Sequence, residues 1–243
     1  MSQPREPIAL CFSGGKDSAL SLYTLRAGDR FEVAALVTTV TEGYDRISMH
    51  GVRRSLLREQ AASISLPLTE VTIPPRASNE IYERAMGEAF TRLRETGIRR
   101  VAFGDLFLED VRDYRLRQLE ALGLECVFPL WGRPTAALAR TFVDDGFRAR
   151  IVCLDPAALD ASFAGRMFDD AFLADLPEGV DPCGENGEFH TFVFDGPIFR
   201  RPLSVSVGEV VERDGFWFCD LLPAARDGAA GNLSGRPIPQ GDP

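Results

Sequence analysis

Residues 13 to 18, with the sequence SGGKDS, combine groups that can hold a phosphate. Glycines let the backbone approach an anion closely, and Lys16 adds a positive charge beside the backbone amides. Lys16 is the only lysine among the 27 basic residues of the chain. Its position indicates that this turn requires a compact ammonium rather than a planar guanidinium, with coincidence as the alternative. The candidate phosphate-binding residues are Ser13, Gly14, Gly15, Lys16, Asp17 and Ser18.

The spacing of this segment excludes two common phosphate-binding loops. It has neither the G-x-x-x-x-G-K of a Walker loop nor the G-x-G-x-x-G of dinucleotide-binding proteins. The pattern SGGxDS instead resembles the PP-loop of the ATP pyrophosphatases, which split ATP between the α and β phosphates and transfer AMP to an acceptor oxygen. A glycine-rich turn in which Ser and Asp only cap the next helix is the alternative.

A second unusual segment is DPCGENGEFHTF, residues 181 to 192. Its three carboxylates are crowded and should raise one another's pKa, which suits proton transfer or ammonium binding. In an extended strand Glu188 and His190 would face the same side. A solvent-exposed polar loop is one alternative, and a metal site with Cys183 and His190 is a weaker one because no known zinc spacing is present.

Further polar residues fall where strands of a parallel sheet should end. Gly104 and Asp105 follow an apolar run, and Asp105 could orient a nucleotide hydroxyl or a magnesium-bound water, or could simply cap a helix. Arg115 lies three residues after Arg112, so the two should share a helix face. His50, which comes before a glycine in a polar loop, is a further candidate site residue. A histidine that only packs or caps is the alternative.

The elements that must position these residues alternate between strand and helix. Apolar runs predict strands at residues 8–12, 31–40, 67–73, 99–105 and 124–130. Helical periodicity predicts helices from about residue 19 to Gly28, and over 52–64, 79–94 and 110–122. The alternation predicts an α/β fold with a doubly wound, parallel, five-stranded sheet.

After residue 128 the pattern changes to that of a smaller α+β unit. Helices are expected near 135–144 and 165–176, and strands at 149–154, 190–194, 203–212 and 216–222, with a turn at 213–215. The expected division is an ATP-binding domain at 1–128 and a substrate-binding domain at 129–223. Residues 224–243 contain few large apolar side chains, which predicts a disordered tail.

Composition excludes several classes of protein. A net charge of −9 makes nucleic acid an unfavourable partner, and 45% apolar residues fit a globular chain. No apolar run is long enough for a membrane span or a signal peptide, so a cytoplasmic protein is expected. The five cysteines are scattered without a CxxC pair, which indicates reduced thiols.

Taken together, the motifs resemble one family, the diphthine–ammonia ligase (diphthamide synthase) family of PP-loop ATP pyrophosphatases. SGGKDSAL, MHGVR, FGDLFLEDVRDYR, PLWGR and DPCGENGEFHTFVFDGP occur in the order that the family shows, and HGVR and FPLWGR are similar to the bacterial members. The resemblance implies a Rossmann-like nucleotide-binding domain and a reaction in which the diphthine carboxylate of elongation factor 2 is adenylated and ammonia then displaces AMP.

The resemblance also implies roles for individual residues. Residues 13 to 18 would hold ATP with Mg²⁺, beside Gly104 and Asp105, and Asp105 would contact the metal. The implied catalytic residues are Lys16, Asp17, Glu188 and His190. The implied substrate-binding residues are His50, Tyr114, Arg115, Glu185, Asn186 and Glu188. The partners would be ammonia or another amine donor and a carboxylate-bearing acceptor, and a homodimer is possible.

Two functions of other classes remain open from the sequence. A PP-loop sulfurtransferase acting on tRNA would need a thiol relay and a basic surface, and both the missing CxxC and the charge of −9 oppose it. A nucleotide sensor without catalysis would need no acceptor pocket, which the 181–192 segment opposes.

Overall fold

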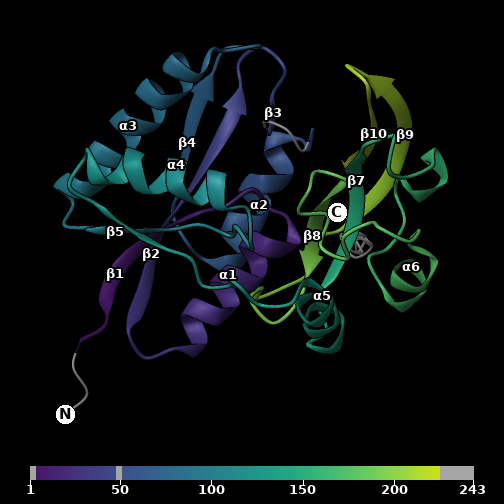
Figure 1. Ribbon diagram of the computed structural model, residues 1–243, viewed down its shortest axis with the longest axis horizontal. Helices are drawn as coiled ribbons and strands as arrows, with labels where there is room; N and C mark the ends of the chain where they lie inside the picture. Colours follow the sequence, from purple (N-terminus) through teal and green to yellow (C-terminus); the bar gives the residue numbers. More distant parts are fainter. Residues whose placement is uncertain (1–3, 48–50, 225–243) are drawn as a thin grey trace, which may run out of the picture.

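The computed structural model describes residues 4–47 and 51–224. Figure 1 shows two units side by side, one built on the sheet that contains β1 and the other on the sheet that contains β7. Within the described residues, no helix is both long and apolar enough to cross a membrane. The predictions of a disordered tail and of a role for His50 fall outside the described residues.

The first sheet is parallel in the order β4-β2-β1-β5-β6, as the alternation of elements predicts. Its strands are β1 (Glu6–Cys11), β2 (Phe31–Thr41), β4 (Leu68–Ile73), β5 (Arg100–Ala102) and β6 (Glu125–Val127). A two-residue strand, β3 (Arg46–Ile47), adds an antiparallel pairing at the end of β2 that the sequence does not predict. The strands expected at 99–105 and 124–130 are shorter than predicted, and Gly104 and Asp105 lie in the loop after β5.

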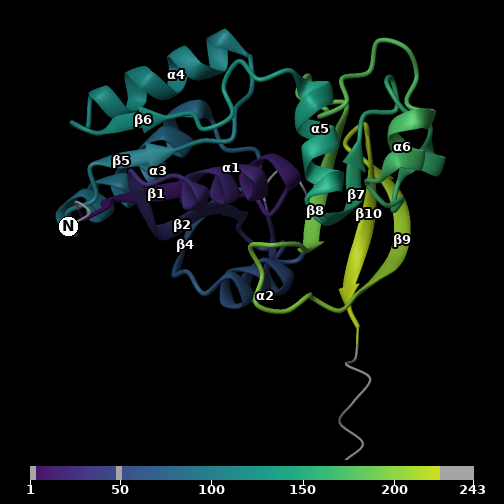
Figure 2. The same cartoon turned by 90° about the horizontal axis from the view of Figure 1, so that it is seen from below.

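Helices cover both faces of this sheet, so the fold is doubly wound. They are α1 (Lys16–Ala27), α2 (Arg54–Ile64), α3 (Asn79–Glu95) and α4 (Glu109–Glu120). Leu22 of α1 and Leu56 of α2 belong to one apolar cluster, whereas Phe90 of α3 and Leu119 of α4 belong to another. Figure 2 shows α2 and α4 on opposite sides of the strands. Burial of apolar side chains on the two faces holds these layers together.

The second unit is an antiparallel sheet in the order β8-β7-β10-β9. Its elements are α5 (Thr135–Asp144), β7 (Arg148–Leu154), η1 (Ala161–Phe163), α6 (Asp170–Asp175), β8 (Phe189–Asp195), β9 (Val205–Arg213) and β10 (Phe216–Pro223). The β9–β10 turn is Asp214-Gly215, with φ values of 52° and 82°. Two such residues at positive φ match the twist of a hairpin, and Arg213 belongs to β9 rather than to the turn.

The predicted helix over 165–176 is wrong in its first half. The Arg166 carbonyl accepts a hydrogen bond from the Ile151 amide at 2.9 Å, and the Phe168 amide donates one to the Ala149 carbonyl at 2.9 Å. This pairing with β7 uses the backbone groups that a helix would need. The helix begins only after Asp169, whose side chain accepts from the Phe172 amide.

The two units share a core. Leu22 and Leu57 of the first unit lie in the same apolar cluster as Phe142 and Phe192 of the second. A tight group of phenylalanine rings in the second unit includes Phe168 and Phe172, whose centroids are 5.3 Å apart. The shared core holds the second sheet against the first unit, and the boundary at 128/129 stays a prediction.

Candidate active site

The turn between β1 and α1 has the backbone geometry of an anion-binding site. Gly14 has a φ of +83°, and a Cβ there would lie 2.5 Å from Gln60 Oε1. Gly15 is the N-cap of α1 and receives no side-chain cap. The helix dipole and those first-turn amides that no side chain occupies favour an anion at this end of the helix.

The second sheet fixes this turn in place. The Val193 amide donates to the Gly14 carbonyl at 2.9 Å, and the Lys16 amide donates to Thr191 Oγ1 at 2.9 Å. Buried Gln60 also donates to the Gly14 carbonyl, at 3.0 Å. Strand β8 therefore forms one wall of the candidate phosphate site. The sequence analysis missed Thr191 and Gln60, because nothing in their local pattern distinguishes them from ordinary strand and helix residues.

Lys16 is the main charged group of the turn. Its side chain is only 3% exposed, and Nζ donates to Asp17 at 2.8 and 3.0 Å and to the Cys183 carbonyl. Burial alone would lower the pKa of Lys16, but the negative charges of Asp17 and neighbouring acidic groups raise it above its usual value. Lys16 is therefore a fixed positive charge that connects the turn to the 181–192 segment.

A cavity of about 350 Å³ opens beside this turn, at the carboxyl ends of β1, β2 and β5. The chain runs from β1 to β2 and β4 on one side of the sheet and then crosses to β5 and β6 on the other. Ligands of doubly wound folds bind where the strand order reverses in this way. The predicted residues that line it are Ser13, Gly15, Lys16, Asp17, Ser18, Gly104, Asp105, Arg115, Glu185 and His190.

Gly104 and Asp105 lie against the phosphate-binding turn. A Cβ on Gly104 would meet the Asp17 backbone and the Ser18 amide at 3.2–3.3 Å, so this position requires a small residue. Asp105 Oδ2 and Arg115 Nε are 3.7 Å apart, and neither forms a hydrogen bond with another described group. Burial raises the pKa of Asp105, and Arg115 opposes this. These two atoms face each other as an ion pair at the cavity wall, and each can still form a hydrogen bond with a ligand.

Glu185 is the carboxylate that the 181–192 segment brings into the cavity. It accepts a hydrogen bond from the Leu106 amide at 2.7 Å and so joins this segment to the loop after β5. Burial, reinforced by Asp17 and Asp105, raises the pKa of Glu185 to about 7, although the Leu106 bond and Lys16 act in the opposite direction. The carboxyl can therefore gain or lose a proton near neutral pH.

Glu188 has a different place from the one expected from the sequence. It is 8% exposed, and its oxygens accept from the Asp181 amide at 3.0 Å, the Asn186 amide at 2.9 Å and Asn186 Nδ2 at 2.9 Å. Neither Glu188 nor Asn186 lines the cavity. These contacts make Glu188 a residue that shapes the segment from within, because buried donors of this loop depend on it.

Replacement of Glu188 by glutamine is expected to lower the free energy of unfolding by about 1–3 kcal/mol, because an NH₂ group would replace one acceptor of buried amide donors. Thermal or urea unfolding measures the change. Glu212→Gln, on the exposed strand β9, is the matched control and should stay within about 0.5 kcal/mol. Equal stability of the two variants would contradict this role for Glu188.

Other predicted residues are not brought into the cavity. Tyr114 does not line it, and its hydroxyl accepts from Gln118 Nε2 at 2.7 Å. Arg112 packs over Trp131, with 4.8 Å from the guanidinium carbon to the ring centroid. Among the lining residues that the sequence analysis missed are Thr38 of β2 and Tyr82 and Met86 of α3. Tyr82 and Met86 are four residues apart along α3, which is also the spacing of an ordinary packed helix face.

Comparison with known proteins finds two family models that match successive parts of the chain. The model of the diphthamide synthase N-terminal domain matches residues 7–125, and that of the diphthamide synthase C-terminal domain matches residues 134–222. Diphthine–ammonia ligase of Homo sapiens is 26% identical over 84% of this chain and 84% of its own length. The enzyme of that name from Schizosaccharomyces pombe is 28% identical over 86% of this chain and 38% of its own length.

The fold and the cavity define a doubly wound α/β protein with a candidate anion-binding site where the strand order of its sheet reverses. The chain belongs to the diphthamide synthase family, and it is an enzyme of the ligase class. Among solved structures, a predicted subunit of tRNA methyltransferase from Methanocaldococcus jannaschii aligns at 18% identity with a TM-score of 0.37, covering 62% of this chain and 78% of that one. A likeness this loose carries no argument about function.

Proposed function

We propose that this enzyme adenylates an acceptor carboxylate with ATP, releases pyrophosphate, and then lets ammonia displace AMP to form an amide. The observation that carries the proposal is the cavity at the sheet's reversal point, where Lys16 and the ion pair of Asp105 and Arg115 meet. The relatives' name, diphthine–ammonia ligase, supports the same chemistry.

ATP fits the residues of this cavity. Residues 13 to 18 would hold the phosphates, and the apolar lining of Val37, Met86 and Phe103 suits the base. In the part of the chain that the structure describes, no cluster of three or more His, Cys, Asp or Glu side chains could hold a metal unaided. Mg²⁺ commonly binds through one or two carboxylates together with substrate phosphates, and Asp105 and Asp17 offer such oxygens. The ion would neutralise charge on the departing pyrophosphate.

Lys16 supports the first half of the reaction. Its buried ammonium is already oriented by Asp17 and the Cys183 carbonyl, so it needs little reorganisation as negative charge develops on the leaving group. Because the Cys183 carbonyl belongs to the 181–192 segment, the same ammonium couples the phosphate site to the proposed acceptor side.

The second half requires a group that takes a proton from the attacking ammonia. Glu185 and His190 line the cavity next to Lys16 and are the proposed groups. A carboxyl with a pKa of about 7 is well matched to proton transfer at neutral pH. Glu188 would act only by holding this segment in shape.

The sulfurtransferase alternative has little support in the cysteines. Burial raises the pKa of Cys11, Cys153 and Cys183 to about 12, so these thiols stay protonated and are weak nucleophiles. The cavity and the ligase relatives also favour catalysis over a nucleotide sensor.

Amide formation can be tested with ¹⁵N-ammonium, ATP, Mg²⁺ and the fraction of a cell extract that contains carboxylic acids, which supplies the acceptor. The proposal expects a ¹⁵N-labelled amide that appears in equal amount to AMP and only when acceptor and enzyme are both present. Release of AMP without nitrogen incorporation would reject ammonia transfer while leaving ATP cleavage intact.

The rate of amide formation in the presence of acceptor is expected to rise as the pH increases through about 7, because Glu185 then loses its proton and can act as a base. Glu185→Gln should be slower and should lack this rise when both proteins are measured at saturating ammonium. Superimposable pH profiles of the two proteins would show that Glu185 is not the titrating group.

A further inference from the structure

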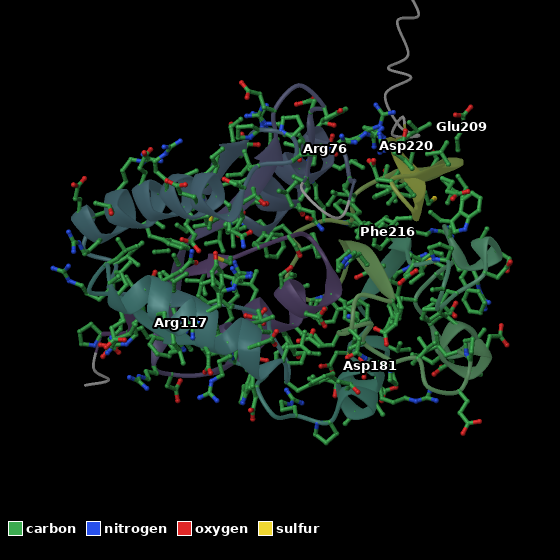
Figure 3. The ribbon with its side chains drawn as sticks, turned by 45° about the horizontal axis from the view of Figure 1, so that its top comes forward. Arg76, Arg117, Asp181, Glu209, Phe216 and Asp220 are labelled. Carbon is green, nitrogen blue, oxygen red and sulfur yellow. The ribbon has the colours of Figure 1, made fainter. Side chains whose placement is uncertain are left out.

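A second cavity, of about 370 Å³, lies between the first sheet and the β9–β10 hairpin. It shares Ile47 and His190 with the ATP cavity, so the two spaces adjoin. Figure 3 shows Arg76, from the first unit, and Phe216, from the hairpin, on the side where the two units meet. An acceptor bound here would lie directly beside the proposed site of ATP cleavage.

The charged lining of this cavity is mostly positive. Arg46, Arg76 and Arg213 line it, against the single carboxylate of Asp214. Arg76 and Asp214 are both strongly exposed and 3.5 Å apart, so they form a solvated ion pair that adds little stability, and the excess positive charge comes from Arg46 and Arg213. Arg213 has no ion-pair partner among the described side chains and lies 5.1 Å over the ring of Phe218.

Arg46 is only partly neutralised. Its guanidinium contacts Asp220 at 2.8 Å, but the same carboxylate also accepts from Arg53 at 2.5 Å. Two guanidinium groups on one carboxylate leave a net positive charge at this wall. Since arginine stays protonated throughout the accessible pH range, the cavity keeps a positive potential.

Aromatic rings form the apolar part of the lining. Tyr44 is 58% exposed, and the half-buried rings of Phe216 and Phe218 have centroids 6.5 Å apart. Gly51 lies directly against Phe218, because a Cβ there would come within 2.7 Å of the ring. Exposed rings beside cationic groups suit a ligand with an apolar body and an anionic edge.

We propose that this second cavity binds the acceptor and selects a small organic acid with an aromatic or apolar body and more than one anionic group. The reacting carboxylate of the bound acceptor would point toward His190 and the ATP cavity. This part of the inference rests on the proposed function. The volume suits a small molecule, and the arginines oppose an acceptor whose recognised group is a quaternary ammonium.

The test measures binding without ATP, so it is independent of the reaction. Calorimetry on the full chain compares three probes that share a benzene ring: phthalate, benzamide and benzyltrimethylammonium. Phthalate should bind, and the other two should bind at least tenfold more weakly. Arg213→Gln and Arg76→Gln should each weaken phthalate binding about fivefold to tenfold, which corresponds to about 1–1.4 kcal/mol.

Arg117→Gln is the matched control, because Arg117 is exposed on α4, away from this cavity. It should leave phthalate binding unchanged, and thermal unfolding should show that all three variants are folded. Failure of phthalate to bind, equal binding of benzyltrimethylammonium, or phthalate binding that neither cavity arginine affects would each overturn the assignment. If the binding test fails but the enzyme still forms AMP from ATP, the acceptor site is wrong and the proposed function stands.

Discussion

Replacing Lys16 by alanine is expected to slow AMP formation by roughly two to three orders of magnitude, the effect of removing one preorganised electrostatic donor. Lys16 is 3% exposed and already in contact with Asp17 and the Cys183 carbonyl. Its loss would also leave Asp17 without its cation. Lys16→Arg should not restore the rate, because a planar guanidinium cannot replace a compact ammonium in so enclosed a site.

The measurement is the initial rate of AMP release at saturating ATP, with Arg117→Ala as the exposed control and circular dichroism as the check on folding. A folded Lys16→Ala protein with the turnover of the unchanged enzyme would mean that the single lysine lies in the turn by coincidence. Full rescue by Lys16→Arg would show that charge alone, without its compact shape, is sufficient.

Replacing His190 by asparagine is expected to separate nucleotide binding from chemistry. His190 lines both cavities, so it lies where the adenylate and the attacking amine would meet. The variant should bind ATP with near-normal affinity in calorimetry, yet form the amide from acceptor and ammonium about a hundredfold more slowly, as expected for loss of a general acid or base.

The control for this variant is Glu188→Gln, which the sequence alone places in the same role as His190. The structure assigns Glu188 to the hydrogen bonds of its own loop, so its main effect should be on stability. If His190→Asn abolished ATP binding in a folded protein, the 181–192 segment would belong to the nucleotide site and the proposed two-site arrangement would fail.

Most of the fold could be predicted from local patterns. The parallel sheet and its helices follow from alternating apolar runs and helical periodicity, and the phosphate-binding turn follows from a glycine-rich segment between the first strand and helix. Asp105 could be placed because it follows β5 at the carboxyl edge of the parallel sheet, and Arg115 of α4 lies beside it.

What could not be predicted depends on contacts between distant segments. The helix expected from residue 165 fails because the 166–168 backbone pairs with β7. Glu188 was expected at the acceptor, but the burial and turn of its loop direct its carboxylate to the Asp181 and Asn186 amides. Thr191 acquires its contact with Lys16 only once β8 packs against the turn. No spacing rule contains this information.

The central claim is that the enzyme splits ATP between the α and β phosphates in the cavity beside residues 13 to 18. It is tested most directly by identifying the nucleotide formed from α-³²P-labelled ATP with Mg²⁺, ammonium and the acid fraction of a cell extract. The account predicts labelled AMP with an equal amount of pyrophosphate, formed by the unchanged enzyme and nearly absent with Lys16→Ala. Labelled ADP with inorganic phosphate would contradict it.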